Sequence, residues 1–253
     1  MLAAALVLVP RAALADLQYD TAGEDVYRLA PAGTVSRVSY LGTERLSAVR
    51  DGKDLRLTAR AHYSREGPEG KNAGDAVFVQ VLHPNGSLED RVDDDPDFLT
   101  ILNQPFAVRL DAATLRDLRA LRGRIPFAAM SPLGNDSMMH GFLRPGTSGE
   151  IGGRQTVAVR FEAAGAISGS LPGYSDGIVS GTMRMDGTAY YSVDSATLLA
   201  LNVTLELDAR LARGKPPVTL PLHVTYRRSL RAAKTLQPAP PATGAGTAAP
   251  ATP

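Results

Sequence analysis

The sequence predicts a mainly β fold: a curved antiparallel sheet, as a half-barrel or a sandwich, with one short helix packed on it. About eight segments alternate apolar and polar residues with a period of two, the pattern of strands that bury one face. Turn residues separate most of these segments, and one segment changes to a helical period. Strands that alternate regularly with helices, which would indicate a parallel α/β fold, do not occur.

Composition and charge exclude several kinds of function. The chain has 253 residues, of which 44% are hydrophobic, enough for one domain with a continuous core. Its 27 basic and 26 acidic side chains give a net charge of +1, so no overall field attracts nucleic acid, and no nucleic-acid partner is expected. Cysteine is absent, which excludes disulfides, thiolate catalysis and thiolate metal ligands.

The first residues have the pattern of a signal peptide. An apolar run over residues 1–10 ends at a proline, and the small residues Ala13 and Ala15 suit cleavage before Asp16. We therefore expect a signal peptide over residues 1–15, no transmembrane segment after cleavage, and a periplasmic or secreted protein. The alternative is an ordinary hydrophobic amino terminus, because no basic residue precedes the apolar run.

The first predicted strands form a hairpin. Residues 35–50 and 53–65 flank Asp51 and Gly52, and an Asp-Gly pair between alternating runs is a strong hairpin signal because glycine accepts a positive φ angle. A third strand is expected over residues 77–82, which a Pro-Asn-Gly turn follows.

The only predicted helix covers residues 111–121. Leu115, Leu118 and Leu121 recur every third residue. Asp111 can cap the amino end, and a glycine follows the carboxyl end. Such a helix would lay a leucine stripe on the sheet.

The clearest strand pattern lies in residues 181–208, which predict a second hairpin with its reversal over residues 193–197. A strand over residues 157–163 precedes this hairpin, and a last strand over residues 218–226 follows it. Pro221 lies within the last strand, which favours an edge position or a bulge.

The strands belong to one β-rich domain over residues 16–234. Residues 235–253 are almost entirely proline, alanine, threonine and glycine. This composition cannot bury a core, so a disordered tail is expected.

The apolar face of the second hairpin is the candidate ligand site. Its side chains either fill the core or form the wall of a cavity. The residues are Met183, Met185, Tyr191, Leu199, Leu201, Val203 and Leu205. Polar strand faces carry histidine and arginine side chains that either bind an anionic or amphipathic ligand or point to water. These residues are His62, Arg160, Arg184 and His223.

Catalytic and metal-binding motifs are weak. Neither a Gly-x-Ser-x-Gly elbow nor a phosphate-binding loop occurs, so no catalytic residue and no cofactor is assigned. A hydrolase would have to use loop and strand residues drawn from Ser131, Asp136, His62, His83, His140 and His223. Two clusters lack the spacing of a metal site, so no metal is assigned. They are the acidic group Asp93, Asp94, Asp95 and Asp97 and the group Met138, Met139 and His140.

Two blocks resemble those of uncharacterised secreted or periplasmic proteins of high-GC proteobacteria, namely residues 105–118 and Gly-Thr-Ala-Tyr-Tyr at residues 187–191. The resemblance implies a compartment outside the cytoplasm. The order of strands with one helix over residues 35–230 also resembles the half-barrel of periplasmic lipoprotein carriers. That likeness is one of fold, and a fold does not determine a function.

These observations predict a non-catalytic periplasmic protein whose curved sheet binds an apolar or amphipathic small molecule or an envelope partner. The alternative is an envelope scaffold or interaction protein without a small-molecule ligand. A second alternative is a hydrolase whose site follows no motif. A closed apolar cavity under the sheet would favour ligand binding, whereas a well-packed core would favour a scaffold.

Overall fold

The computed structural model describes residues 13–30, 33–83, 88–93, 124–130, 137–171, 174–195 and 197–233, together with Arg116, Leu118 and Ala120. These residues form twelve β-strands. The strands are β1 (Ala13–Leu29), β2 (Thr34–Asp51), β3 (Asp54–Gly67), β4 (Gly70–Leu82), β5 (Leu88–Asp93), β6 (Ile125–Met130), β7 (Met138–Pro145), β8 (Gly149–Ile151), β9 (Arg154–Leu171), β10 (Tyr174–Ser192), β11 (Leu198–Arg213) and β12 (Val218–Ala232).

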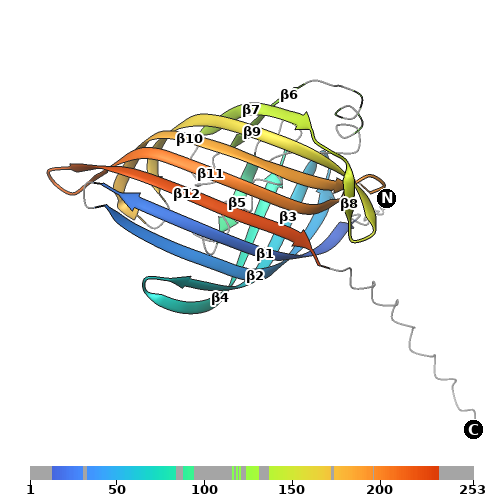
Figure 1. The fold of residues 1–253 in the computed structure, drawn as a ribbon, viewed down its shortest axis with the longest axis horizontal. Helices are drawn as coiled ribbons and strands as arrows, with labels where there is room; N and C mark the ends of the chain where they lie inside the picture. The colour runs from blue at the N-terminus through green and yellow to red at the C-terminus, as the bar shows by residue number, and fades with distance from the viewer. Residues whose placement is uncertain are drawn as a thin grey trace, which may run out of the picture.

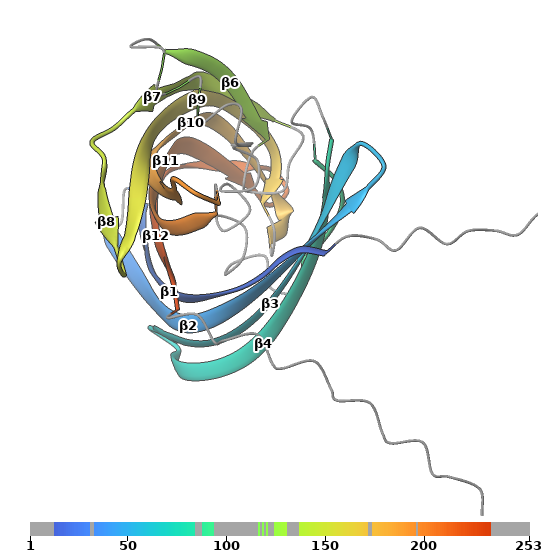
Figure 2. The same cartoon turned by 90° about the vertical axis from the view of Figure 1, so that its right-hand side faces the viewer.

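All twelve strands belong to one open antiparallel sheet, as Figure 1 shows. The strand order is β5-β4-β3-β2-β1-β12-β11-β10-β9-β7-β6, and β8 pairs with β9. The predicted mainly antiparallel β fold is therefore confirmed. A single sheet replaces the two sheets of the sandwich alternative, and Figure 2 shows how it curls so that one face points toward the middle of the molecule.

Both predicted hairpins are confirmed. Strands β2 and β3 pair antiparallel around a turn in which Gly52 has φ 61°, a conformation that glycine adopts without steric cost. Strands β10 and β11 pair with Met183 opposite Leu207 and Met185 opposite Leu205, so their apolar residues share one face. The alternation in the sequence therefore predicted the face of each residue over most of this hairpin.

We call the side of the sheet that carries Met185, Leu205 and Val224 the inner face, and the opposite side the outer face. All three side chains are fully buried and belong to one continuous core cluster. Their sequence neighbours on the outer face are mostly polar and exposed, for example Asp186 and Glu206. This two-sided pattern is expected for an antiparallel sheet with one buried face.

Glycines on the inner face make room for large neighbours. Gly187 lies between Phe161 on β9 and Val203 on β11. A Cβ atom at Gly187 would overlap the Phe161 ring and approach the carbonyl oxygen of Asn202. The ring therefore packs directly over the glycine backbone, an arrangement that compensates for the missing side chain in a bent strand.

The position of Pro221 corrects one expectation. Strand β12 lies in the middle of the sheet, between β1 and β11, and not at an edge. Leu29 and Leu222 form the last pair of the β1–β12 ladder, and Pro221 lies one residue outside this pair. The missing N–H of proline therefore removes no bond from the interior of that ladder.

The short helix is not confirmed. Of the predicted segment 111–121, only Arg116, Leu118 and Ala120 are described. Leu118 is fully buried and belongs to the core cluster of the sheet, as the predicted leucine stripe requires of this residue. Among the described residues, no helix has the length and apolar composition needed to cross a membrane.

The predicted signal peptide and tail fall largely outside the described residues. Residues 1–12 and 234–253 are not described. Strand β1 begins at Ala13, so it includes the last residues of the predicted signal peptide, and Ala15 pairs with Ala48 of β2. Both terminal segments stay predictions from the sequence.

Candidate functional site

The predicted ligand face of the second hairpin is packed core. Met183, Met185, Leu201 and Leu205 are at most 1% exposed, and they lie in the same cluster as core residues from both halves of the sheet. Three main hollows open among the described residues, and of the seven predicted residues only Val203 lines one of them. The face that the sequence assigned to a ligand therefore contacts other side chains of the protein.

Leu199, one of the seven predicted ligand residues, does not lie on the inner face of the sheet. The pairing of β10 with β11 shifts by one residue between Tyr190 and Tyr191, so that Tyr191 pairs with Leu198. A β-bulge of this kind reverses the alternation beyond it. The core cluster accordingly contains Leu198 and not Leu199, although Leu199 is also buried.

The predicted polar residues do not converge. His62, on β3, is exposed and contacts Asp75 across the strand pair, with 2.8 Å between Nδ1 and Oδ1. Arg160 and His223 line two different hollows on the outer face, and Arg184 lines none of the three hollows. The sequence placed these residues correctly on polar strand faces, but the sheet spreads them over its outer side.

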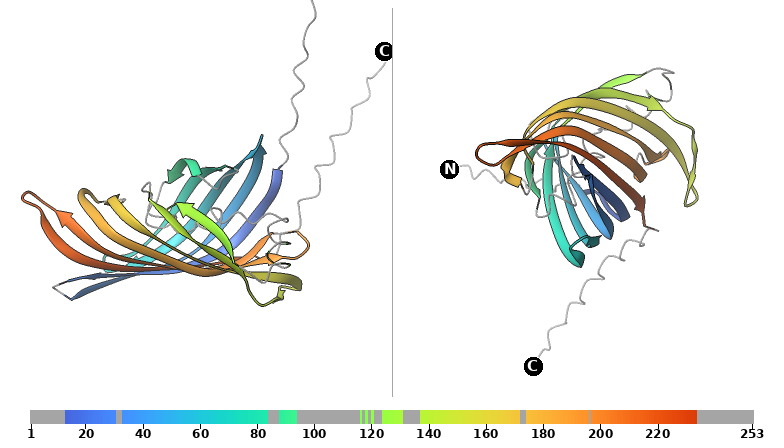
Figure 3. Two further views of the ribbon diagram at one scale, coloured as in Figure 1. Left: turned by 90° about the horizontal axis from the view of Figure 1, so that it is seen from above. Right: turned by 60° about the vertical axis from the view of Figure 1, so that its left-hand side comes forward.

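An apolar hollow does open on the inner face at one end of the sheet. We call it the end pocket, and it has a volume of about 530 Å³. Strands β1, β2, β11 and β12 contribute its apolar wall, and the turn between β3 and β4 borders it. In Figures 1 and 3 the tips of these strands reach the same end of the molecule. The apolar wall consists of Tyr27, Leu29, Val38, Leu211, Leu222 and Val224.

Polar and charged side chains also line the end pocket. Arg65, Lys71 and Arg213 are cationic, and Glu69 is the only acidic residue in the lining. Ser36 and Asn72 add neutral hydrogen-bonding groups. The end pocket therefore combines an apolar wall with a mostly cationic set of polar groups, which is the composition of a site for an amphipathic molecule.

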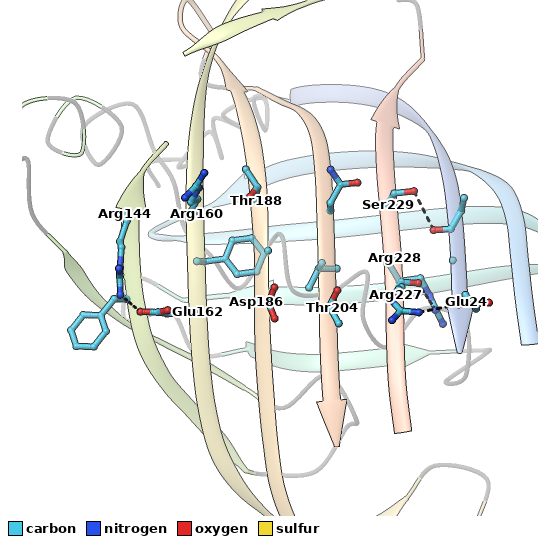
Figure 4. A pocket seen from close by; sticks show the side chains of 17 residues that line it. Glu24, Arg144, Arg160, Glu162, Asp186, Thr188, Thr204, Arg227, Arg228 and Ser229 are labelled. Atoms are coloured by element: carbon cyan, nitrogen blue, oxygen red, sulfur yellow. Dashed lines mark hydrogen bonds and ion pairs between the residues drawn. The ribbon is translucent and has the colours of Figure 1, made fainter. Parts of the chain in front are cut away.

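A hollow of about 740 Å³ lies on the outer face across β7, β9, β10, β11, β12 and β1, as Figure 4 shows. Four of its charged side chains form two ion pairs with one another. Arg227 bonds Glu24 at 3.0 Å, and Arg144 forms an ion pair with Glu162. These exposed pairs are typical of a solvated strand surface, so this hollow is a weaker candidate for a small molecule than the end pocket.

Asp208 and His223 line a second outer hollow, and together with Thr225 they form a group that resembles a hydrolase triad. Nδ1 of His223 lies 2.6 Å from Oδ1 of Asp208, and Nε2 of His223 lies 3.3 Å from Oγ1 of Thr225. However, Thr225 is only 5% exposed, so its hydroxyl does not reach a substrate on the surface. The predicted hydrolase residues Ser131 and Asp136 lie outside the described residues.

A fully buried ion pair joins β1 and β12. The guanidinium of Arg228 donates to both carboxylate oxygens of Asp25, with 3.1 Å between Nη2 and Oδ2. The same guanidinium lies 4.4 Å from the centre of the Tyr40 ring. Burial acts to lower the pKa of Arg228, but the charge and hydrogen bonds of Asp25, together with Tyr40 and Tyr27, outweigh it and hold that pKa above its ordinary value.

Glu44 is a buried acid that the sequence analysis missed. It is 0% exposed, and neither carboxyl oxygen has a hydrogen-bond partner among the described residues. Burial raises the pKa of Glu44 to about 8. It pairs across the sheet with Tyr19, whose hydroxyl donates to the Leu198 carbonyl oxygen at 2.9 Å. The sequence does contain a signal for this buried acid, because Glu44 interrupts the apolar side of a strand that also carries Leu46.

Of the two groups to which the sequence assigns no metal, the group at residues 138–140 is described and the acidic group only in part. Met138 and His140 are exposed, whereas Met139 between them is fully buried, so β7 separates these side chains onto opposite faces. Of the acidic cluster only Asp93 is described. Within the described part of the chain, no group of three or more His, Asp or Glu side chains could hold a metal ion.

The comparisons with known proteins do not identify a family. No family model matches the chain, and no curated protein matches it. Among solved structures, the chain is similar to DynF from the dynemicin biosynthesis pathway of Micromonospora chersina. The match covers 88% of this chain and 85% of that chain, at 9% sequence identity and a TM-score of 0.28, which is too low to support an argument about fold or function.

Proposed function

We propose that this is a non-catalytic periplasmic protein that binds an apolar or amphipathic small molecule in the end pocket. One observation carries the proposal: the apolar inner face becomes accessible at the end pocket, where Leu29, Leu211 and Leu222 line a hollow of about 530 Å³. Small-molecule sites have volumes of roughly 300–1,000 Å³ and mostly apolar walls with a few polar groups. The export of the protein rests on the predicted signal peptide over residues 1–15.

The physical basis of binding is the removal of apolar surface from water. Each Å² of apolar ligand surface that the wall covers contributes about 25 cal/mol to binding before entropic costs. Leu211 and Leu222 are only half-buried in the protein alone, so a ligand can cover the part of their apolar surface that is still exposed. Polar groups of a ligand would remain close to Ser36 and Asn72, which also line the pocket.

The alternative is an envelope scaffold that binds a protein partner. The packed core favours this alternative, because Met185 and Leu205 line none of the three main hollows among the described residues. A scaffold would use the outer face, where the large polar hollow lies. The two proposals differ in whether an apolar molecule binds in the end pocket.

The experiment measures binding of the neutral apolar dye N-phenyl-1-naphthylamine by fluorescence and identifies copurified lipids by mass spectrometry. A Leu211→Gln variant places a polar side chain on the wall of the end pocket and should weaken dye binding about tenfold, the effect expected from losing one buried apolar side chain. Leu41→Gln is the matched control, because Leu41 is 65% exposed on the outer face of β2.

Either of two results would contradict the proposal. The first is that the wild-type protein neither binds the dye nor retains a lipid. The second is that Leu41→Gln and Leu211→Gln weaken dye binding equally, because the dye would then bind away from the end pocket.

A further inference from the structure

We propose that the end pocket selects amphipathic molecules with an anionic head group, such as a carboxylate or a phosphate monoester. The inference rests on the proposed function, since it specifies the ligand class of the same pocket. Its evidence is the distribution of charge around the apolar wall.

Positive charge is concentrated at the end pocket. Three cationic side chains, Arg65, Lys71 and Arg213, and one carboxylate, Glu69, line it, so the pocket carries an excess of two positive charges. The whole chain has a net charge of only +1. An apolar site bordered by cations attracts an anion and disfavours a cation of the same shape.

The two arginines lie where a head group would emerge from the apolar wall. Arg65, on β3, is half-buried and pairs across the sheet with Tyr40 on one side and Asn72 on the other. Arg213 is the last residue of β11, two positions after Leu211 of the wall, and therefore on the same face. A ligand with its chain against Leu211 would thus place its head close to cationic side chains.

Arginine is suited to this task because its planar guanidinium binds a carboxylate or a phosphate through two parallel hydrogen bonds. Arg65 and Arg213 each already take part in an interaction within the protein. The proposal needs their positive charge and donors, and it does not require either side chain to be without a partner.

The nearest buried acid does not oppose an anion. Asp25 pairs across β1 and β2 with Val38 of the pocket wall. Its carboxylate is neutralised by the bidentate bond with Arg228. Glu69 remains the one carboxylate at the pocket, and it is exposed to solvent, where water screens its charge.

The experiment compares ligands that share one chain and differ in the head group. Dodecanoate, dodecyl phosphate, dodecanol and dodecylammonium each compete with bound N-phenyl-1-naphthylamine on the full chain at low salt. Charge-assisted hydrogen bonds should make dodecanoate bind about 10- to 100-fold more tightly than dodecanol. Dodecyl phosphate should share this advantage, and dodecylammonium should bind more weakly than dodecanol.

Variants of the cationic residues test whether the selectivity for an anionic head group arises at the end pocket. Arg213→Gln should lower the affinity for dodecanoate toward that for dodecanol and leave dodecanol unchanged. Arg213 is exposed, so this variant tests charge without removing a core side chain. Lys71→Gln is a second exposed variant with the same expected direction. Arg160→Gln is the matched control, because Arg160 lies in the outer hollow.

The outcomes separate this inference from the proposed function. Equal displacement by dodecanoate and dodecanol in the wild-type protein would overturn the anionic selectivity and leave apolar binding intact. An equal loss of dodecanoate binding in Arg160→Gln and Arg213→Gln would also overturn it. Failure of the wild-type protein to bind the dye at all would refute the proposed function itself.

Discussion

Replacing Glu44 by glutamine should remove a large part of the pH dependence of folding. Glu44 is fully buried without a hydrogen-bond partner among the described residues, and its pKa in the folded chain is about 8, against an ordinary value of 4.5. The folded chain therefore keeps a proton that the unfolded chain releases as the pH rises above 4.5. The protonated carboxyl is favoured because a buried carboxylate without a partner is strongly destabilised.

The direction and size of the effect follow from these two pKa values. Below pH 4.5 both states are protonated, so Glu44 imposes no ionisation cost on folding. As the pH rises from 4.5 to about 8, ionisation of Glu44 stabilises the unfolded chain alone. The free energy of unfolding therefore falls progressively over this range. At about 1.4 kcal/mol for each pKa unit, the loss between the two pKa values reaches about 5 kcal/mol.

The assay is urea unfolding of wild-type protein and Glu44→Gln at several pH values from 4.5 to 8, with linear extrapolation to water. Glutamine keeps the size of the side chain and does not titrate. We expect the two proteins to differ least at pH 4.5, and the variant to be the more stable at pH 8 by up to about 5 kcal/mol. Other titrating groups contribute equally to both proteins and cancel in the difference.

Glu206→Gln is the control, because Glu206 is exposed on the outer face of β11. Its stability should follow that of the wild-type protein at every pH. The reasoning about Glu44 would be refuted by a difference between wild type and Glu44→Gln that does not change with pH. It would also be refuted by a variant that is less stable than wild type at pH 8.

Three further substitutions test the packing of the sheet by urea unfolding. Asp25→Asn should cost about 3–5 kcal/mol, because Arg228 would remain buried without its counter-charge, and a loss below about 1 kcal/mol would contradict this reading. Gly187→Ala should cost about 1–3 kcal/mol, because the new Cβ overlaps the Phe161 ring, and an unchanged stability would show that the ring can move freely. Glu162→Gln breaks an exposed ion pair and should change the stability by less than about 1 kcal/mol; a larger loss would mean that the pair is shielded from water.

Local patterns predicted the strands and the faces of most of their residues. The alternation of Met183 and Met185 with polar residues, and the same pattern around Leu205, is enough to specify a strand pair with a shared apolar face. At Leu199 the alternation predicted the wrong face, because a single bulge reverses the alternation and leaves no signal in the sequence. Pro221 suggested an edge strand or a bulge, but it belongs to a central strand and lies just past the end of the β1–β12 ladder.

The candidate site was much less predictable. From the sequence, the apolar face of the second hairpin could either fill the core or form the wall of a ligand cavity, and in the structure it is packed core. The end pocket combines residues from six neighbouring strands and the turn between β3 and β4, for example Tyr27, Arg65 and Leu211, which are far apart in the chain. No spacing along the sequence marks such a set, because the residues become neighbours only when the sheet is assembled.

By itself the sequence determined a mainly antiparallel β protein, its two clear hairpins, and which side chains point away from water. A period of two is a local property, so it can be read without knowing what each strand packs against. Only the tertiary structure decided that β1 pairs with β12, which joins Tyr19 to Ala232. That pairing depends on the whole strand order, and with it come the burial of Glu44, the Asp25–Arg228 ion pair and the opening of the inner face at the end pocket.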